Sequence, residues 1–524
     1  MKHFLWQAPT WLGALIYLGG VFAALVALLL QATPSDWGLS LTQSYLWRLI
    51  QFSFTQALLS ALLSIVLAIP VISALYHNQF LGRRWLLNLF AVSIVVPTIV
   101  AILGIVIVYG RQGWFTSLFG FHFPLYGLGG ILLAHVFFNL PLVVRLGLQV
   151  YGLIPDGQWR LATQLGLNRW QAFRVIEWPY LRRSLPGTFL LVFLLCFSSF
   201  AVVLSLGGGP KSSTLEVAIY QALRFEFDLS KASFLALLQV SICLALGGFV
   251  FRYIQPLQQD ASLYRGAPQL RRRKRDFVVD LGSLMLAAVW IVPPFVAVLT
   301  PIWSAEFLVA LASPGLWQAT LVSLQVAIPS GLLSLMMALS LVSLARGFLY
   351  LGCSRVMRYL EQSANLVLML PGLVLATGLF LLLRHTGGGI NNAYWVVVWV
   401  NAVMALPFVV RAIAPAMLQQ QQRYGHLYEQ YAILGWIRFK LEWSAIRKAL
   451  AQGLAYAVLL SLGDLGVVAL FGSQGLETLP LYLYRLIGSY RVEQGSSVAV
   501  VLVLLCVALF FLITRCVGGR DVTN

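Results

Sequence analysis

The chain has 524 residues, of which 60% are hydrophobic and 10% are charged, and its formal net charge is +18. This balance lies far outside that of soluble globular domains, so the composition predicts a protein whose solvent is the lipid bilayer. The positive charge would also suit nucleic-acid binding, but its placement along the chain follows membrane topology instead. We therefore expect membrane lipid, and no nucleic acid, among the partners.

Apolar runs long enough to cross a membrane recur along the whole chain. A helix needs roughly 20 apolar residues to span a hydrocarbon core about 30 Å thick. The runs predict an all-α polytopic protein of about 12 transmembrane helices, with gaps too short for a soluble domain. They lie near residues 10–31, 49–76, 88–109, 127–150, 187–206, 233–251, 278–300, 318–345, 365–383, 393–416, 451–472 and 496–514.

Basic residues indicate the orientation of these spans. With Lys2 placed in the cytoplasm, about 27 of the 35 Lys and Arg residues fall in cytoplasmic segments and about 8 outside. The acidic residues divide almost evenly, and Asp280 and Asp464 stay within spans or at their edges. The pattern predicts that both termini are cytoplasmic, and we interpret the first apolar run as a retained anchor, not a cleaved signal.

An internal repeat divides the chain near the basic run RRRKR at 271–275. We expect a first six-helix half over 1–264, a basic cytoplasmic linker over 265–276 and a second six-helix half over 277–524. Because six is even, the halves are parallel repeats, which favours a path between them. Matching stretches are 46–53 with 316–323, Pro97 and Gly104 with Pro371 and Gly378, 139–145 with 405–411, Glu177-Trp178 with Glu442-Trp443, and Thr214, Leu215 and Tyr220 with Thr478, Leu479 and Tyr484.

Each half has one long cytoplasmic loop, near 151–186 and 417–450, between its fourth and fifth spans. In the first loop, the spacing of Gly166, Ile176 and Pro179 resembles the EAA loop of binding-protein-dependent ABC importer permeases. In that loop a short helix, a glycine-permitted turn and a second helix form a knob that fits a groove on an ATPase. The alternative is an ordinary interfacial turn with an aromatic anchor.

The two loops match the family pattern to different degrees. In the first, Ala162, Gly166, Ile176 and Pro179 fit the pattern, and Trp178 replaces its leucine. In the second, with one residue deleted, Ala432 takes the glycine position, Leu441 the isoleucine, Trp443 the leucine and Ser444 the proline. A symmetric grip on an ATPase is therefore open to question.

The resemblance implies a MetI-like type I importer permease fold and assigns ATP hydrolysis to another chain. Two copies of a cytosolic ABC ATPase are then the expected partners, and they bind the ATP and Mg. This chain is expected to have no cofactor, no metal and no catalytic residue. The sequence GGGPKSS at 207–213 is not a phosphate loop, because Pro210 precedes Lys211 where that motif needs glycine.

Two segments predicted outside the membrane, 207–232 and 472–495, follow the fifth span of each half. Their glycine-rich breaks and short helical patterns suit docking of a periplasmic solute-binding protein. Tyr220 and Tyr484 are candidate contacts, although an interfacial aromatic belt explains them equally well.

Asp464 is the clearest ionisable residue within a predicted span. At a helix centre an acid costs roughly 2.5–3.5 kcal/mol, so it should face a path or a partner. Its counterpart in the first half is Ser199. A carboxylate on the path would favour a cationic solute, while a structural aspartate is the alternative.

The stretch 450–491, the fused plan and the chain length are similar to those of the thiamine permease family of Gram-negative bacteria. That resemblance implies a bacterial inner-membrane protein, a thiamine-binding periplasmic partner and thiamine as solute. The alternatives are a ferric-iron importer permease and, from another class, a secondary transporter with a 6+6 repeat. An embedded enzyme lacks support, because the five Cys and six His show no metal-ligand spacing.

Overall fold

The computed structural model describes residues 8–32, 44–120, 122–253, 274–350, 352–385, 393–431, 433, 435–472, 475–489 and 491–518. These residues are almost entirely helical and contain no β-strand within those ranges, which confirms the all-α class. The predicted linker lies mostly outside the described residues, and its last three positions begin α15.

The first half consists of α2 (Ala8–Gln31), α4 (Ser44–His77), α5 (Arg83–Val95), α6 (Thr98–Tyr109), α7 (Trp114–Phe119), α8 (Leu128–Gly152), α9 (Asp156–Gln164), α10 (Arg169–Ala172), the π-helical turn η1 (Phe173–Glu177), α11 (Trp178–Phe197), α12 (Phe200–Leu206), η2 (Pro210–Ser212), α13 (Leu215–Gln221), η3 (Ala222–Glu226) and α14 (Leu229–Tyr253).

The second half consists of α15 (Lys274–Leu299), η4 (Thr300–Trp303), α16 (Ala305–Leu311), α17 (Pro314–Tyr350), α18 (Ser354–Leu366), η5 (Val367–Met369), α19 (Gly372–His385), α20 (Ala393–Gln430), α21 (Gly435–Leu462), α22 (Gly466–Phe471), α23 (Leu479–Gly488) and α24 (Val492–Gly518). Among the described residues, 11 helical segments are long and apolar enough to cross a membrane, and a twelfth is a bent pair. The prediction of about twelve spans is confirmed.

A proline interrupts the helix within the third apolar run of each half. Pro97 separates α5 from α6, and Pro371 separates η5 from α19, where the helix axes bend by 89°. Proline has no amide hydrogen and its ring clashes with the preceding turn, so it ends a helix that apolar composition alone would continue. The apolar runs 88–109 and 365–383 therefore do not each form one continuous helix.

The fifth span of each half is also interrupted. α11 ends at Phe197 before α12 begins at Phe200, and α21 ends at Leu462 before α22 begins at Gly466. Next to the first break, the Ser198 hydroxyl donates to the carbonyl of Leu194 at 2.7 Å, a local bond that competes with the helix. The apolar runs 187–206 and 451–472 are therefore not continuous helices, and the breaks contain Ser199 and Asp464.

The two halves interlock through their first spans. α2 packs on α17 and α19 of the second half, and α15 packs on α4 and α6 of the first half. A β-carbon at Gly104 would clash with the Pro294 carbonyl of α15, and one at Gly378 would clash with the Ala24 carbonyl of α2. This repeated glycine pair therefore permits the close backbone approach through which each half holds the first span of the other.

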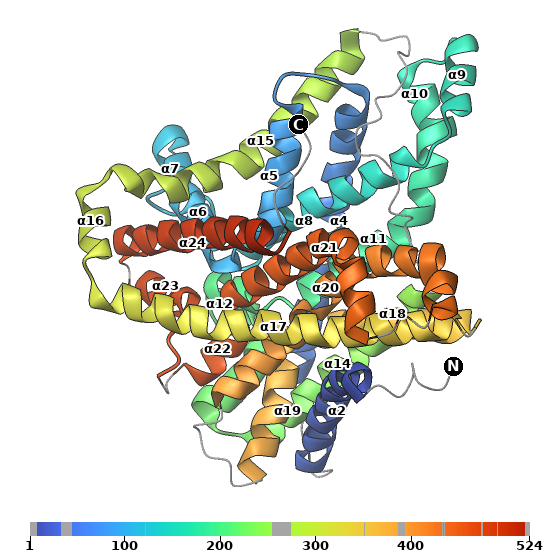
Figure 1. The fold of residues 1–524 in the computed structure, drawn as a ribbon. Coiled ribbons are helices and arrows are strands. Elements are labelled where there is room, and N and C mark those ends of the chain that lie inside the picture. Colours follow the sequence, from blue (N-terminus) through green and yellow to red (C-terminus); the bar gives the residue numbers. More distant parts are fainter. Residues whose placement is uncertain are drawn as a thin grey trace.

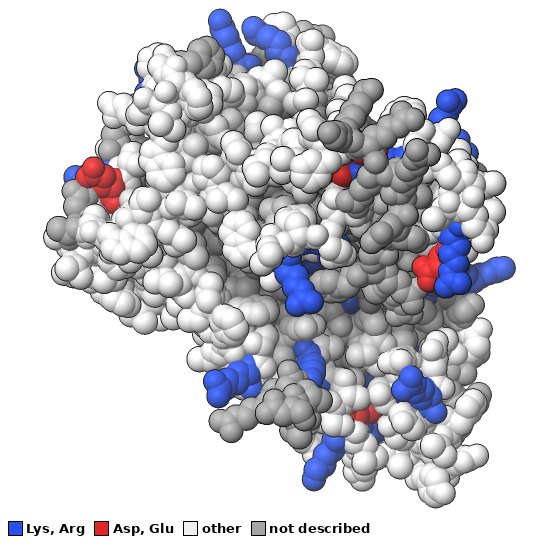
Figure 2. Space-filling view, turned by 90° about the horizontal axis from the view of Figure 1, so that it is seen from above, with Lys and Arg blue, Asp and Glu red and all other residues white. Residues whose placement is uncertain are grey.

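The fourth spans lie at the centre and the first spans at the periphery. In the most apolar stretches of α8 and α20, 72% of the residues are buried, against 33% in α2, α15 and α24. Figure 2 shows a face on which large areas carry neither acidic nor basic side chains. Such a surface suits contact with lipid.

The short helices gather at two opposite ends of the molecule. α9, α10 and α18 lie towards one end, on the right in Figure 1, whereas α7, α16 and α23 lie towards the other. We call the first of these the elbow end.

Two matched hydrogen bonds fix the short helices that follow the fifth spans. The amide of Leu215 donates to Ser53 Oγ at 3.1 Å, and that of Leu479 donates to Ser323 Oγ at 2.7 Å.

Candidate functional site

The first elbow, residues 156–180, is a helix, a tight turn and a second helix. Gly166 follows α9 with φ of +65°, the left-handed region that glycine adopts without strain. Its amide donates to the Thr163 carbonyl at 3.1 Å and that of Leu167 donates to the Ala162 carbonyl at 3.0 Å, which is the paired bonding of a Schellman turn. The sequence prediction of a glycine-permitted turn is confirmed.

A capping box starts the helix on the other side of this turn. The Gln171 amide donates to Asn168 Oδ1 at 3.0 Å, and the Asn168 amide donates to Gln171 Oε1 at 2.9 Å. Both bonds satisfy amides that lack a partner within the helix. The two helix ends are thus fixed by local bonds, which makes the first elbow a rigid knob.

A π-helical turn lies within the first elbow, where its second helix continues into the membrane span. The amide of Trp178 donates to the Phe173 carbonyl, one residue further back than in an α-helix. In the second half, α21 runs as a regular helix through the equivalent stretch. The offset between the halves falls by one residue between Phe173 and Glu177, so the π-helical turn accommodates the residue that the second half lacks.

The second elbow, residues 417–443, joins α20 to α21. The amide of Ile433 donates to the Tyr428 carbonyl at 2.7 Å, matching the bond from Leu167 to Ala162 in the first elbow. Ala432, predicted at the glycine position, lies outside the described residues. Leu441 is 54% exposed, whereas its predicted equivalent Ile176 is buried, so these two side chains differ in their surroundings.

Matching aromatic side chains cover both elbows. Trp170 stacks on Phe173 with ring centroids 5.6 Å apart, and Trp436 stacks on Phe439 at 5.3 Å. Trp170 is 70% exposed and Trp436 is 74% exposed. Trp178 and Trp443 extend the two sets and contact the same phenylalanines. Each elbow thus presents a rigid apolar surface of the kind that anchors protein interfaces.

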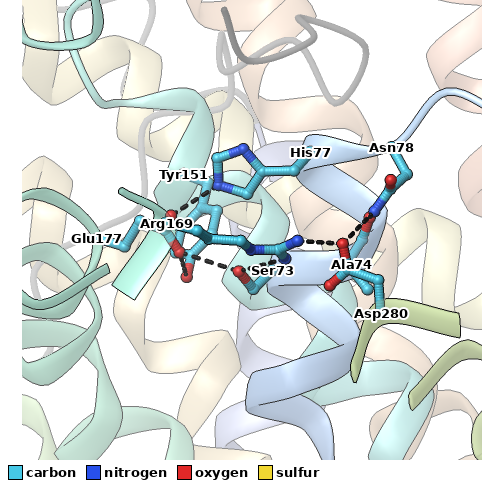
Figure 3. A network of polar contacts seen from close by, with 8 residues as sticks. All are labelled: Ser73, Ala74, His77, Asn78, Tyr151, Arg169, Glu177 and Asp280. Carbon is cyan, nitrogen blue, oxygen red and sulfur yellow. Dashed lines mark hydrogen bonds and ion pairs between the residues drawn. The ribbon is translucent and has the colours of Figure 1, made fainter. Parts of the chain in front are cut away.

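A buried carboxylate lies behind the first elbow. Glu177 is fully buried, and it accepts hydrogen bonds from Tyr151 Oη at 2.6 Å and from Ser73 Oγ at 3.2 Å. His77 Nε2 lies 2.7 Å from the other carboxylate oxygen. The side chains converge from α4, α8 and the π-helical turn, as Figure 3 shows. This cluster fixes the first elbow to the spans behind it.

The same network reaches the second half. Arg169, the first residue of α10, forms an ion pair with Asp280 of α15, and its second terminal nitrogen donates to Ser73 Oγ at 3.1 Å. Asn78, directly after α4, donates to Asp280 at 2.8 Å. Figure 3 shows Asp280 and Glu177 on opposite sides of the Arg169 and Ser73 side chains.

The second elbow also has a buried glutamate, but its partners differ. Glu442 accepts bonds from Arg346 of α17 at 2.6 Å and from Arg438 of α21 at 2.9 Å. Arg438 also bonds Gln421 and lies over the Tyr428 ring, 5.0 Å from its centroid. All of these residues belong to the second half.

The broken fifth spans meet where the two halves touch. A β-carbon at Gly463 would lie 3.2 Å from Pro97 of the first half, and one at Gly466 would lie 3.5 Å from the Phe200 ring. Between these glycines, Asp464 accepts the amide of Gly466 at 3.2 Å through Oδ1. Its Oδ2 is buried and has no hydrogen-bond partner in the described part of the chain. Ser199 lies in the matching break, directly before Phe200.

Sequence reasoning missed a second acid near this break. Glu216 of α13 is buried, and burial, with a smaller contribution from nearby Asp464, holds the pKa of its carboxyl well above the usual value. The two acids come from different halves. Glu216 falls in a segment predicted to lie outside the membrane, so neither span prediction nor the repeat identified it.

The two tyrosines predicted to contact a binding protein lie partly inside the structure. Tyr220 is buried, with its ring 5.2 Å from that of Phe200, and Tyr484 is half-buried. More exposed aromatic side chains follow Tyr220 in the chain. Phe225 contacts its ring at 5.8 Å, and Phe227, in the left-handed region with φ of +54°, is 78% exposed.

Comparison with known proteins decides the family. Residues 67–260 match the model of the binding-protein-dependent transport system inner membrane component. The chain is 43% identical over 99% of its length to the thiamine transport system permease protein ThiP of Salmonella typhimurium and covers 98% of that protein. The chain belongs to this permease family. The Escherichia coli member is 42% identical over 99% of this chain and 97% of its own length, and the Haemophilus influenzae member 39% over 95% and 93%.

Membership of the family states what kind of component the chain is. It is the membrane-embedded permease of a binding-protein-dependent ABC importer, and not itself an enzyme. An ATPase subunit and a solute-binding protein are the partners that such a permease requires. The matched model falls within the first half and includes the first elbow, the half whose loop fits the EAA pattern better.

Proposed function

We propose that this permease carries thiamine, delivered by a periplasmic thiamine-binding protein, into the cytoplasm of a bacterial cell. The observation that carries the proposal is similarity along nearly the whole chain to relatives named as thiamine transport permeases. The elbow end is assigned to the cytoplasm and both termini with it, because the basic residues concentrate in the segments predicted on that side.

Two copies of a cytosolic ATPase dock on the elbows, one on each. The support is the pair of exposed aromatic surfaces, which have the same stacking geometry although Gly166 and Pro179 are present only in the first elbow. Ala162 and Ile176 are buried behind the first surface and position it, while Trp178, Leu441 and Trp443 contribute exposed side chains. ATP and Mg are bound by those partners.

Asp464 and Ser199 lie on the solute path between the halves. The buried Oδ2 of Asp464, which has no hydrogen-bond partner in the described part of the chain, supplies negative charge near the Phe200 ring, which in turn contacts the Tyr220 ring. Carboxylates and aromatic faces both attract organic cations, and thiamine contains a permanently charged thiazolium ring. A site of this kind selects for a cation without requiring a metal.

The opposite end receives the binding protein. Phe225 and Phe227 present exposed rings at this end, and the more buried Tyr220 and Tyr484 support the surface from inside the protein. A strained exposed phenylalanine is typical of a binding surface, because its conformation has a cost that only the surrounding structure or a partner offsets.

Reconstitution tests this proposal. The chain is purified with its ATPase, inserted into liposomes, and supplied with the binding protein loaded with radiolabelled thiamine. We expect ATP-dependent thiamine uptake that Asp464→Asn reduces at least tenfold, while Ser241→Ala, a variant on an exposed face of α14, leaves it unchanged. Uptake of ferric iron instead of thiamine, or uptake driven by an ion gradient without any ATPase, would overturn the proposal.

A further inference from the structure

The ion pair of Arg169 and Asp280 crosses between the halves. Arg169 opens α10 in the first elbow, and Asp280 lies on α15, the first span of the second half. α15 packs in turn on α4 and α6 of the first half. The first elbow is therefore bonded to a helix that continues, through η4 and α16, into the rest of the second half.

Burial and additional hydrogen bonds hold this ion pair in one arrangement. Asp280 is 4% exposed and accepts a further bond from Asn78, and Arg169 is held by Ser73. Bonds between charged groups away from water are shorter and stronger than neutral ones, and salt screens them little. Removing one partner leaves a buried charge that the site cannot satisfy.

In the described part of the second elbow, the ion pairs of the buried glutamate remain within one half. That glutamate is bonded to Arg346 and Arg438. α2, the first span of the first half and the counterpart of α15, contains no Asp or Glu. A reciprocal ion pair from the second elbow to α2 is thus impossible with this sequence.

We infer that Arg169 and Asp280 form a cross-half link, through which movement of the first elbow is transmitted to α15 and hence to the second half. Both are positioning residues, since they act on the path through the helices that they join. The link rests on the proposed docking of an ATPase at the first elbow, but it does not depend on the identity of the solute. It makes the two elbows unequal in their charged bonds: the first elbow is paired with α15 of the other half, whereas the ion pairs described for the second elbow stay within its own half.

The test compares uptake with hydrolysis in the reconstituted complex of permease, ATPase and binding protein. For Arg169→Gln and Asp280→Asn we expect at least a threefold fall in thiamine molecules imported per ATP hydrolysed, with the ATPase still bound. The charge exchange Arg169→Glu with Asp280→Lys should recover at least half of the lost ratio. The conservative Arg169→Lys keeps the charge but not the second bond to Ser73, so its ratio should lie between those of wild type and Arg169→Gln even if the neutral variants assemble poorly.

Arg346→Gln is the matched control, because it breaks a buried ion pair to a glutamate within one half. It is expected to lower the yield of folded complex more than the ratio of uptake to hydrolysis. An equal fall in that ratio for Arg346→Gln and Asp280→Asn, or an unchanged ratio in both neutral variants and in Arg169→Lys, would overturn the cross-half link.

A substrate-independent measurement separates this inference from the proposed function. Spin labels at Leu165 and Val278, both exposed, report the distance between the first elbow and α15 in the complex with its ATPase. We expect one narrow distance distribution with and without a non-hydrolysed ATP analogue, and a broadened one in Asp280→Asn. If the wild-type protein imports no thiamine but keeps the narrow distance distribution, the proposed solute is wrong and the cross-half link is supported. An equally broad distribution in wild type and Asp280→Asn would overturn the cross-half link.

Discussion

The two elbows of this permease have the same outer surface on different internal supports. Each presents a tryptophan stacked on a phenylalanine, and each has a buried glutamate behind it. Behind the first elbow that glutamate bonds a tyrosine, a serine and a histidine, and behind the second it bonds two arginines. Both halves have kept the position of the acid and the aromatic surface, while the partners of the acid have changed.

A single residue accounts for part of this difference. From the stacked tryptophan to the buried glutamate, the first elbow has one residue more than the second, and a π-helical turn next to Pro179 accommodates it. Proline has no amide hydrogen to donate. A widened turn next to Pro179 therefore costs one backbone hydrogen bond less than it would beside another residue. One repeat can therefore accommodate an extra residue within a single turn, so that the tryptophan after it, Trp178, is as exposed as Trp443 in the other repeat.

The largest expected effect concerns the two buried glutamates. Glu442→Ala leaves two buried arginines without their shared carboxylate, and it should lower the free energy of unfolding by about 3–5 kcal/mol. Glu177→Ala leaves hydroxyl and imidazole groups unpaired and should cost about 1–3 kcal/mol. Thermal unfolding of the detergent-solubilised chain gives both values. Equal losses would show that the two supports are energetically alike.

The next effect concerns docking. Trp170→Ala and Trp436→Ala should each weaken binding of the ATPase by about 2 kcal/mol, or roughly thirtyfold, as the loss of an exposed aromatic anchor does. Because both rings are largely in solvent, the stability of the chain should change by less than about 0.5 kcal/mol. Binding to immobilised permease measures the first quantity. Val175→Ala, on the same elbow, is the control; if it weakened binding as much as Trp170→Ala, the rings would not be the anchors.

A smaller effect tests the turn of the first elbow. Gly166→Ala should cost about 1–2 kcal/mol, because φ of +65° is strained for a residue with a β-carbon. No neighbouring atom lies within 4 Å of that β-carbon, so the cost is conformational and not steric. Gly166→Asn should cost less, since asparagine tolerates this region better. Thermal unfolding distinguishes the two, and an equal cost for both would contradict the conformational explanation.

The smallest effect should be equal in the two halves. Ser53→Ala and Ser323→Ala each remove the hydroxyl that accepts the first amide of α13 or α23, and each should cost about 1 kcal/mol. Ser241→Ala, whose hydroxyl bonds within an exposed helix, serves as the reference and should change stability by less than about 0.5 kcal/mol. Unequal losses at Ser53 and Ser323 would limit the symmetry to the elbows.

Sequence alone predicted the helical class, the number of spans, the duplication and the helix–turn–helix of the first elbow. Each of these depends on local information: apolar length, a repeated pattern, or a glycine at a turn. Gly104 and Gly378 were visible as a repeated pair, but their reason was not, because each faces a helix of the opposite half.

The sequence could not show which spans are broken, or which buried charges meet. Pro97 and Pro371 stand inside apolar runs that a hydropathy count joins, and Ser199 and Asp464 lie in breaks that no proline marks. The pairing of Arg169 with Asp280 links residues far apart in the chain, and Glu216 came to Asp464 only through the packing of α13. Such contacts are properties of the tertiary fold and leave no periodic signal.

The most direct test of two docking elbows on one chain is the composition of the purified transporter. Native mass spectrometry of the detergent-solubilised complex should give one permease chain with two ATPase subunits. Trp170→Ala and Trp436→Ala should each shift the population towards one ATPase, and the double variant towards none. A wild-type complex with a single ATPase, or two ATPases retained in the double variant, would contradict the account.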